Sequence, residues 1–328
     1  MATVSGRSGA RRVLRHQQPS DEAVAEVAWL YFVKNLTQGE IAARLGLSRP
    51  TVISYLRLAK ERGIVRIAVA DVHHRANALA DALVERFGLA TAHVVDGEGL
   101  AGAELTRVVA ETAAHFLPEF ARPGDEIGVS WGQTVSFVSE HVPHWPVPDL
   151  TVRQIIGSMA NPLVPSCEAC SLEIARRLTA TCVNLHAPAV LSSADLAARL
   201  MEEPILKEQL ANVRRCNKAV YSLSDCSPDT HLVKFGVTTR EDIARYAAMG
   251  AAGIIAGRFV DEEGTPLLGE LDRRIVGIDL ASLRTMEGLL VVSGPAKTRA
   301  SLAALRGGFA NHVVADAALA EAILAAAP

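Results

Sequence analysis

The stretch LTQGEIAARLGLSRPTVISYLRLAKERG, residues 36–63, has the spacing of two short helices joined by a tight turn. Thr37 and Glu40 form a capping box, in which each side chain satisfies a free backbone N–H at the start of a helix. Gly46 permits the left-handed backbone of a turn, and Ser48 is suited to cap a second helix. The stretch therefore predicts a helix-turn-helix, an element by which many proteins bind DNA.

The second of these helices separates an apolar face from a polar one. Val52, Leu56 and Ala59 lie four and three residues apart, so they form one buried stripe. The opposite arc is free to enter a major groove, and it carries Arg49, Pro50, Ile53, Ser54 and Arg57. The residues expected to contact DNA are Gln38, Ser48, Arg49, Pro50, Thr51, Ser54 and Arg57. An ordinary pair of packed helices explains the apolar stripe, but not the small Ala42 or the outward arginines.

Charge is unevenly distributed along the chain. Residues 1–70 contain 11 Lys and Arg against 5 Asp and Glu, a net charge of +6, whereas the whole chain carries −3. The rest of the chain therefore carries −9. A basic head attracts phosphates, and an acidic body discourages DNA from wrapping around it. The predicted partner of the head is double-stranded operator DNA.

Composition indicates a layered α/β protein. The chain is 49% hydrophobic but only 5% aromatic, so its core must consist mainly of Ala, Val, Leu and Ile. No apolar run approaches the roughly 20 residues of a membrane-spanning helix, and the N-terminus lacks the apolar core of a signal peptide. We therefore expect a cytoplasmic protein without a membrane partner. Residues 1–20, rich in Arg, Gly and Ser, are predicted to form a disordered basic tail.

The hydrophobic pattern predicts a small all-α domain followed by a larger α/β domain. Residues 21–70 are expected to form the helix-turn-helix domain, with a short strand at 64–70, and residues 71–87 a linker helix. From residue 88 onward, apolar β-rich runs occur at 92–96, 126–130, 151–157, 182–187, 219–225, 253–257, 289–294 and 312–316. Helical patterns occur between most of them, at 101–117, 168–180, 240–249, 296–306 and 316–326. Such alternation indicates a mostly parallel sheet covered on both faces, and the domain at 88–328 is expected to bind an effector and to oligomerise.

In a parallel sheet, ligands bind beyond the carboxyl ends of the strands, where loops lead into helices. Two such loops contain glycine: Ser130–Thr134 and Gly294–Lys297. Gly132 lets backbone N–H groups approach a ligand at a helix N-terminus, and Lys297 offers a positive charge to an anion. Asp225 ends another strand and either accepts hydrogen bonds from a sugar hydroxyl or caps the next turn. The expected effector-binding residues are Ser130, Trp131, Gly132, Gln133, Thr134, Asp225, Gly294 and Lys297.

Residues 128–132 also match the nucleophile elbow G-x-S-x-G of α/β hydrolases. A catalytic triad would then join Ser130 to Asp225 or Asp279 and to His312. The chain has no upstream HGGG-type segment for an oxyanion hole, and a hydrolase has no use for a DNA-reading head. We therefore favour a binding site over a hydrolytic one.

The cysteines do not predict a disulfide framework, because they are odd in number and scattered. Cys167 and Cys170 form a C-x-x-C, which is either a redox or metal pair or two small residues opening a helix. A zinc site with four ligands would need a second close pair, and none exists. We therefore predict neither a metal nor a cofactor.

Several motifs occur in the order typical of one family. The chain carries, after the helix-turn-helix, GVSWGQTV (128–135), LHAPAVL (185–191), GRFVDEEGTPL (257–267), LDRRIVGIDL (271–280) and SGPAKTRASLAALRGG (293–308). From about residue 22 to its C-terminus it resembles the SorC/DeoR-type sugar-binding transcriptional regulators, which include the central glycolytic gene regulator. The resemblance implies an effector domain similar to the sugar-phosphate isomerase and glucosamine-phosphate deaminase fold. It also implies a homotetramer, with a dimer as the alternative, that represses or activates sugar or polyol catabolic genes.

The resemblance also implies how the effector is held. Family members bind a phosphorylated sugar between the first glycine loop, here Ser130–Thr134, and the lysine of a late G-x-x-K, here Gly294 and Lys297. Where relatives usually read GAVGD with an acidic residue facing the sugar, this chain has Ile254. Their double glycine before the lysine is reduced to Ser293-Gly294. Because isoleucine cannot bond a hydroxyl, a deoxygenated or short ligand should be tolerated better than a fully hydroxylated hexose.

The sequence thus favours a transcription factor controlled by a small, phosphorylated effector, and not an enzyme. One alternative is a catalytically active isomerase- or deaminase-like enzyme with a DNA-binding head. Its base, poised near an enolisable carbon, would come from Asp225 and His231. The other alternative is a constitutive DNA-binding protein whose large domain serves only oligomerisation.

Overall fold

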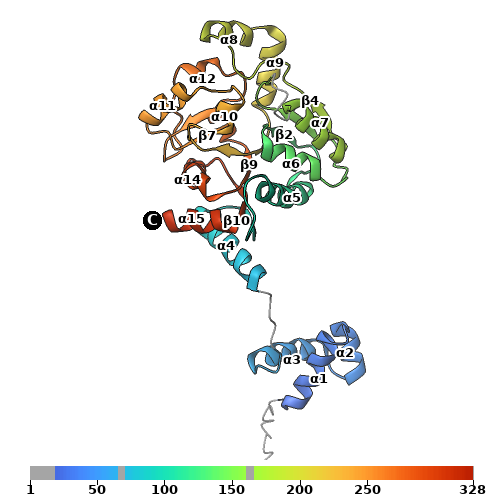
Figure 1. Ribbon diagram of the computed structural model, residues 1–328. Coiled ribbons are helices and arrows are strands. Elements are labelled where there is room, and N and C mark those ends of the chain that lie inside the picture. The colour runs from blue at the N-terminus through green and yellow to red at the C-terminus, as the bar shows by residue number, and fades with distance from the viewer. Residues whose placement is uncertain (1–18, 66–70, 160–165, 328) are drawn as a thin grey trace, which may run out of the picture. The chain divides into compact units, whose positions relative to one another are not determined.

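The computed structural model describes residues 19–65, 71–159 and 166–327. The chain divides into two compact units, Met1–Ala70 and Asp71–Pro328 (Figure 1). The expected tail falls almost entirely outside the described residues, except that Ser20 caps the first helix. Of the short strand expected at 64–70, only residues 64 and 65 are described, and they lie in a bend.

The smaller unit contains three helices. They are α1 (Asp21–Phe32), α2 (Gln38–Leu45) and α3 (Arg49–Glu61). The capping box of Thr37 and Glu40 is present, and Gly46 ends α2 in the left-handed conformation with φ 63°. Ile41 of α2 and the predicted stripe of α3 are buried together with residues of α1. The predicted helix-turn-helix is therefore confirmed, including the caps of its two helices.

A seven-stranded sheet forms the centre of the larger unit, in the order β1-β10-β9-β5-β2-β3-β4. These strands are β1 (Thr91–Val95), β2 (Glu126–Val129), β3 (Thr151–Gln154), β4 (Thr181–Val183), β5 (Lys218–Tyr221), β9 (Glu287–Val292) and β10 (His312–Asp316). Every pair of neighbouring strands in it is parallel. The expected α/β class with a mostly parallel sheet is confirmed.

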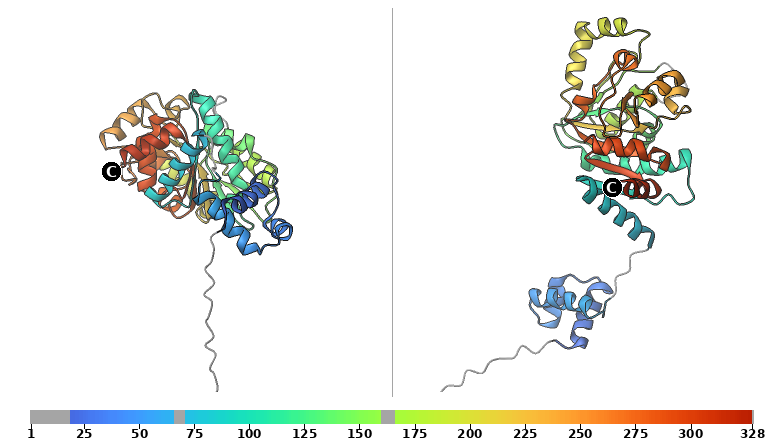
Figure 2. Two further views of the ribbon diagram at one scale, coloured as in Figure 1. Left: turned by 90° about the horizontal axis from the view of Figure 1, so that it is seen from below. Right: turned by 90° about the vertical axis from the view of Figure 1, so that its left-hand side faces the viewer.

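Helices cover both faces of this sheet (Figure 2). One face packs against α5 (Gly102–Phe120), α6 (Gln133–His141) and α7 (Cys167–Leu178). The other packs against α4 (Asp71–Phe87), α14 (Thr298–Arg306) and α15 (Ala317–Ala326). After Glu287, strand β9 is buried from both sides, which explains why residues 289–292 are all apolar.

Helix α4, expected as a linker, is part of the larger unit. It packs against β1 and α15, and its Leu83 is fully buried in the core of that unit. Arg75 of α4 also pairs with Glu321 of α15, with 2.7 Å between nitrogen and oxygen. No helix within the described ranges is long and apolar enough to cross a membrane.

A second, antiparallel sheet contains β6 (Leu223–Ser224), β7 (Gly253–Ile255) and β8 (Arg258–Val260). Placing residues 253–257 in the parallel sheet was therefore wrong, and the run 219–225 divides between the two sheets. The reason lies in the two-residue turn between β7 and β8. Ala256 and Gly257 both have positive φ, 48° and 79°, which is the geometry of a tight hairpin and reverses the chain at once.

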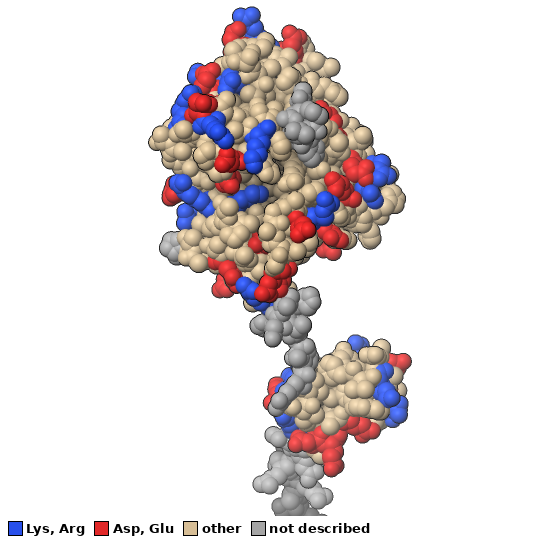
Figure 3. Space-filling model, in the orientation of Figure 1, with Lys and Arg blue, Asp and Glu red and all other residues tan. Residues whose placement is uncertain are grey.

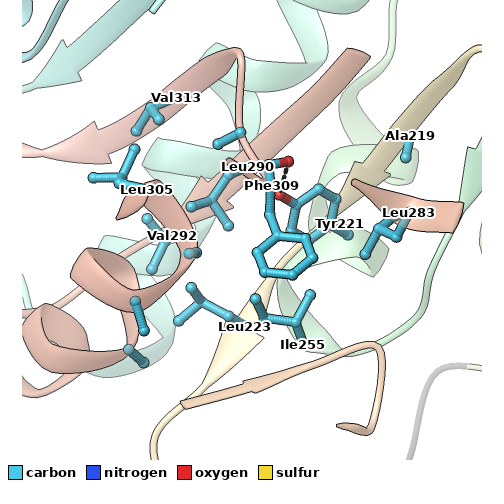
Figure 4. Close-up of a cluster of buried hydrophobic side chains, with 14 of the residues drawn as sticks. Ala219, Tyr221, Leu223, Ile255, Leu283, Leu290, Val292, Leu305, Phe309 and Val313 are labelled. Atoms are coloured by element: carbon cyan, nitrogen blue, oxygen red, sulfur yellow. Dashed lines mark hydrogen bonds between the residues drawn. The ribbon is translucent and has the colours of Figure 1, made fainter. Parts of the chain in front are cut away.

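The remaining helical segments connect these layers. They are α8 (Ala194–Met201), α9 (Pro204–Val213), α10 (His231–Lys234), α11 (Arg240–Ala248), α12 (Glu270–Arg274), α13 (Leu280–Leu283) and the 3-10 turn η1 (Pro295–Lys297). Figure 4 shows the core where β5, β9 and the segment after α14 meet. There the hydroxyl of Tyr221 donates to the backbone carbonyl of Phe309. This bond satisfies the one polar group of a fully buried tyrosine.

Candidate functional site

The three central strands β9, β5 and β2 place a crevice at the carboxyl edge of the sheet. The chain leaves β2 into α6 on one face, whereas it leaves β9 into α14 on the opposite face. Where successive connections go to opposite faces, the loops separate and leave room for a ligand. The topology therefore puts a site above β2, β5 and β9.

A cavity of about 510 Å³ occupies this position, within the usual range for small-molecule sites. All eight residues expected to bind the effector line it: Ser130, Trp131, Gly132, Gln133, Thr134, Asp225, Gly294 and Lys297. These residues are separated by as many as 167 positions in the sequence. They meet because Ser130–Thr134 follow β2, Asp225 follows β5 and the short β6, and Gly294 and Lys297 follow β9.

The first glycine loop presents free backbone donors to the cavity. Gly132 has φ 127°, a conformation that side chains disfavour, and it is the N-cap of α6 without any side-chain cap. The first N–H groups of a helix have no partner inside the helix, so those of Gln133 and Thr134 are available to a ligand. Together with the helix dipole, they favour an anion.

The second glycine loop, Gly294–Lys297, is held in place by Asp316 at the end of β10. Gly294 has φ 90°, and its N–H donates to the carboxylate of Asp316 at 2.6 Å. The other oxygen of Asp316 accepts from the N–H of Leu319 at 3.0 Å, which caps α15. Lys297 follows in this fixed loop. Burial lowers the pKa of Lys297, and the negative charges of Asp225 and Asp316 offset part of this effect.

A second helix start, which we did not predict, reaches the same cavity. Helix α5 begins at Gly102 with φ 56° and has no side-chain cap. Gly102, Ala103 and Thr106 line the cavity, and the hydroxyl of Thr106 bonds that of Ser293 at 2.8 Å. The sequence signal was the same as in the other loops, a glycine between an apolar strand and a helix.

The cavity contains further polar groups, of which Ser222 and Lys234 were not predicted from the sequence. The indole nitrogen of Trp131 and the hydroxyl of Ser222 are buried and have no hydrogen-bond partner among the described residues. His231 and Lys234 of the short helix α10 also line the cavity. Burial lowers the pKa of His231, Lys234 and Lys297 lower it further, and Asp225 partly offsets them. Unpaired buried donors are costly, so these groups are candidates to bond a ligand.

Asp225 and Ile254 define a different side of the cavity. One oxygen of Asp225 accepts from the N–H of Ser227 at 3.0 Å, so Asp225 caps a turn and also faces the cavity. Ile254 lines the cavity as well, beside Ile156 and Leu223, and all three are almost completely buried. This side offers a ligand apolar contact together with the carboxylate of Asp225.

The geometry excludes the hydrolase triad. His312 is the first residue of β10, at the edge of the sheet opposite the cavity, where it bonds Thr91 and Glu287 at 2.8 Å each. Asp279 caps α13 and bonds Arg214 at 3.2 Å. Neither lines the cavity that contains Ser130. By contrast, Asp225 and His231, the acid–base pair of the enzyme alternative, both line it.

The C-x-x-C pair opens a helix and is inaccessible. Cys167 and Cys170 lie in the first turn of α7 and are buried. Burial raises the pKa of the Cys170 thiol to about 12 and that of Cys167 well above its ordinary value. Because the thiolate is the reactive form, burial argues against a redox role. No group of three or more metal-binding side chains occurs among the residues the structure describes.

In the smaller unit, the residues expected to contact DNA divide into two sets. The hydroxyls of Ser48 and Thr51 bond each other at 2.7 Å, and the Ser48 hydroxyl caps α3 by accepting from the Thr51 N–H. Arg49 and Arg57 are exposed on α3, where Arg49 reaches Gln38 at 3.5 Å and Arg57 pairs with Glu61 at 2.8 Å. Pro50 is also exposed and Ser54 partly so. On the face shown in Figure 3, acidic side chains of this unit gather along its lower part, and basic side chains lie at its sides.

Comparisons with known proteins match both parts of the chain to known families. The family model described as "Putative sugar-binding domain" matches residues 73–325, and one described as "Winged helix-turn-helix DNA-binding" matches residues 34–66. The transcriptional regulator YjhU of Escherichia coli is 34% identical over 313 residues, covering 93% of this chain and 95% of that protein. The deoxyribonucleoside regulator of Bacillus subtilis is 29% identical over 301 residues, covering 91% and 96%.

Solved structures show the same architecture. The full-length sorbitol operon regulator SorC from Klebsiella pneumoniae has a TM-score of 0.71 at 25% identity and covers 92% of this chain and 98% of its own. A DeoR family transcriptional regulator from Listeria monocytogenes has a TM-score of 0.70 at 24% identity, covering 76% and 99%. Sequence motifs, topology and relatives therefore agree: the chain belongs to the SorC/DeoR-type sugar-binding transcriptional regulators, with a helix-turn-helix that binds DNA.

Proposed function

We propose that this regulator is controlled by a small phosphorylated sugar or polyol that binds in the cavity above β2, β5 and β9. The phosphate contacts Lys297 and the free N–H groups at the start of α6, with the hydroxyls of Ser130 and Thr134 as further donors. Asp225 accepts a hydrogen bond from a hydroxyl of the sugar. Trp131, Gln133 and Gly294 complete the contacts.

One observation carries this proposal: the uncapped starts of α5 and α6 and the side chain of Lys297 converge on one cavity. Each helix start presents about half a positive charge and a set of free N–H donors. A single helix start is common, but two helix starts and a lysine around one small space favour negative charge. A phosphate has enough oxygens to use donors from several directions at once.

The names of two relatives support a proposal for the class of regulated genes. One is named for deoxyribonucleosides and another for the sorbitol operon, both of which concern sugars or polyols. We infer that this chain controls carbohydrate or polyol catabolic genes from the cytoplasm. Gln38, Arg49, Pro50, Ser54 and Arg57 are proposed to contact the operator. Ser48, which caps α3, and Thr51 in its first turn are proposed to contact the operator as well.

The effector is proposed to leave the cavity unchanged, so the protein is not an enzyme. The relatives are named as transcriptional regulators, which supports this reading. Asp225 has one oxygen committed to a turn and also lines the cavity, which suits it to accept a hydrogen bond from a bound ligand. Turnover of a sugar phosphate at ordinary enzymatic rates would contradict this.

Thermal-shift measurements with sugars, polyols and their phosphates test the effector class. A phosphorylated ligand at 100 times its Kd should stabilise the protein by about 2.7 kcal/mol, which is easily detected. Because Ile254 cannot bond a hydroxyl, a deoxy sugar phosphate should stabilise more than its fully hydroxylated counterpart at equal concentration. If no ligand of these classes shifted the transition, the large domain would be a constitutive oligomerisation module instead.

The protein is also proposed to act as a homotetramer, or failing that as a homodimer. One helix-turn-helix reads too few base pairs for specificity, so heads must act in pairs on half-sites about one helical turn apart or multiples of it. Light scattering of the full chain at micromolar concentration should give four times, or twice, the mass of 34.9 kDa. A mass equal to that of one chain would contradict the proposed assembly.

A further inference from the structure

The outward face of α3 carries one large apolar side chain between two arginines. Arg49, Ile53 and Arg57 are spaced by four residues, so they follow one line along the helix. Ile53 is 48% exposed, whereas Val52 and Leu56 on the inward face are buried in the core of the head. The exposure of Ile53 is thus a property of its face and not of a loosely packed helix.

Within the described part of the head, the buried clusters form without Ile53. They use the inward residues of α3 together with α1 and α2. An exposed isoleucine at this position adds little to folding, and β-branched residues are also weaker helix formers than leucine or alanine. Stability therefore does not explain why an isoleucine stands in the middle of this face.

The major groove offers an apolar group that matches Ile53. Each A·T pair exposes the C5-methyl of thymine there, and side chains recognise it by apolar contact. A charged side chain gains nothing from a methyl group, but an isoleucine and a methyl together exclude water. We propose that Ile53 is a specificity-determining residue that reads a thymine by its methyl group. This inference rests on the proposed entry of α3 into the major groove.

The neighbouring arginines set the position of that thymine. Arg49 is held only by a long bond of 3.5 Å to Gln38, so it is free to reach a base edge. Four residues of helix correspond to about 6 Å along the axis, and base pairs are stacked about 3.4 Å apart. The thymine therefore lies about two base pairs from the base that Arg49 contacts, once in each half-site.

The experiment uses the full chain and DNA selected by the wild-type protein from a random duplex pool. Each thymine of the selected site is then replaced singly by deoxyuridine, which removes only the methyl group. Wild type should lose affinity roughly threefold to tenfold at one thymine per half-site, as expected for one apolar contact. Ile53→Ala should bind the original site more weakly by a similar factor and should be indifferent to that replacement.

Two variants serve as controls. Val33→Ala shortens another exposed apolar side chain, 61% exposed at the end of α1, and should keep the sensitivity to deoxyuridine. Arg49→Ala should lose selectivity at its own base but also keep that sensitivity. The inference is overturned if wild type tolerates deoxyuridine everywhere, if Ile53→Ala remains sensitive, or if selection enriches no sequence. The thermal-shift result stands apart from all of these outcomes, so the effector proposal succeeds or fails on its own.

Discussion

Replacing Lys218 with methionine should lower the free energy of unfolding by about 3–5 kcal/mol, the largest effect we expect from a single side chain. Lys218 is only 3% exposed at the start of β5, and its ammonium lies 3.0 Å from Asp125 and 3.5 Å from Glu287. It also donates to the backbone carbonyl of Phe120. Methionine preserves the apolar stem, so the variant removes the charge and leaves a buried carboxylate without its cation.

Urea unfolding measures this effect, and Lys207→Met is the matched control. Lys207 also pairs with a carboxylate, that of Glu202 at 2.6 Å, but its side chain is 64% exposed. Exposed pairs contribute about 0–1 kcal/mol, so this variant should unfold almost like wild type. Equal effects of the two variants would show that burial does not determine the strength of the Lys218 pair.

The pair of Lys218 with Asp125 should also affect how stability depends on pH. Burial alone would raise the pKa of Asp125, but bonds from Asn217, the Arg122 N–H and Lys218 lower it below its ordinary value. A carboxylate whose pKa is lower in the folded state stabilises the fold above its unfolded pKa. That contribution is lost as the pH falls through the folded pKa. Wild type should therefore lose stability below about pH 4, and Lys218→Met should show a flatter dependence there.

Replacing Lys297 with alanine should weaken the binding of a phosphorylated effector about 10- to 150-fold, the loss expected for a hydrogen bond to a charged group. Lys297 provides the formal positive charge of the loop that begins at Gly294, and Asp316 fixes that loop in place. Thr134→Ala removes only a neutral donor and should cost at most about tenfold. Calorimetry of both variants against a sugar phosphate and its parent sugar would measure the losses.

The parent sugar is the control for the role of the charge. Without a phosphate, the ligand should bind wild type and Lys297→Ala almost equally. Because burial lowers the pKa of Lys297, phosphate affinity in wild type should also fall with rising pH sooner than for an exposed lysine. Equal losses for both ligands would mean that Lys297 supports the loop and does not contact phosphate.

Local features of this protein could be predicted from its sequence. The caps at Thr37 and Ser48, the left-handed Gly46 and the buried stripe of α3 all depend on residues within a few positions of one another. The two glycine loops could be found for the same reason, because a strand, a glycine and a helix start follow each other directly in the chain. Such patterns depend on backbone conformation and short-range hydrogen bonds, which neighbouring residues determine.

Long-range features required the tertiary structure. The run at 253–257 is as apolar as a strand of the parallel sheet, but the hairpin at Ala256 and Gly257 places it in another sheet. The contribution of α5 to the cavity depends on the strand order, which puts β1 beyond β10 at one end of the sheet. The buried pair of Lys218 with Asp125 joins residues 93 positions apart. Sequence patterns report which side chains are apolar or can cap a helix, whereas strand order and burial decide which of them meet.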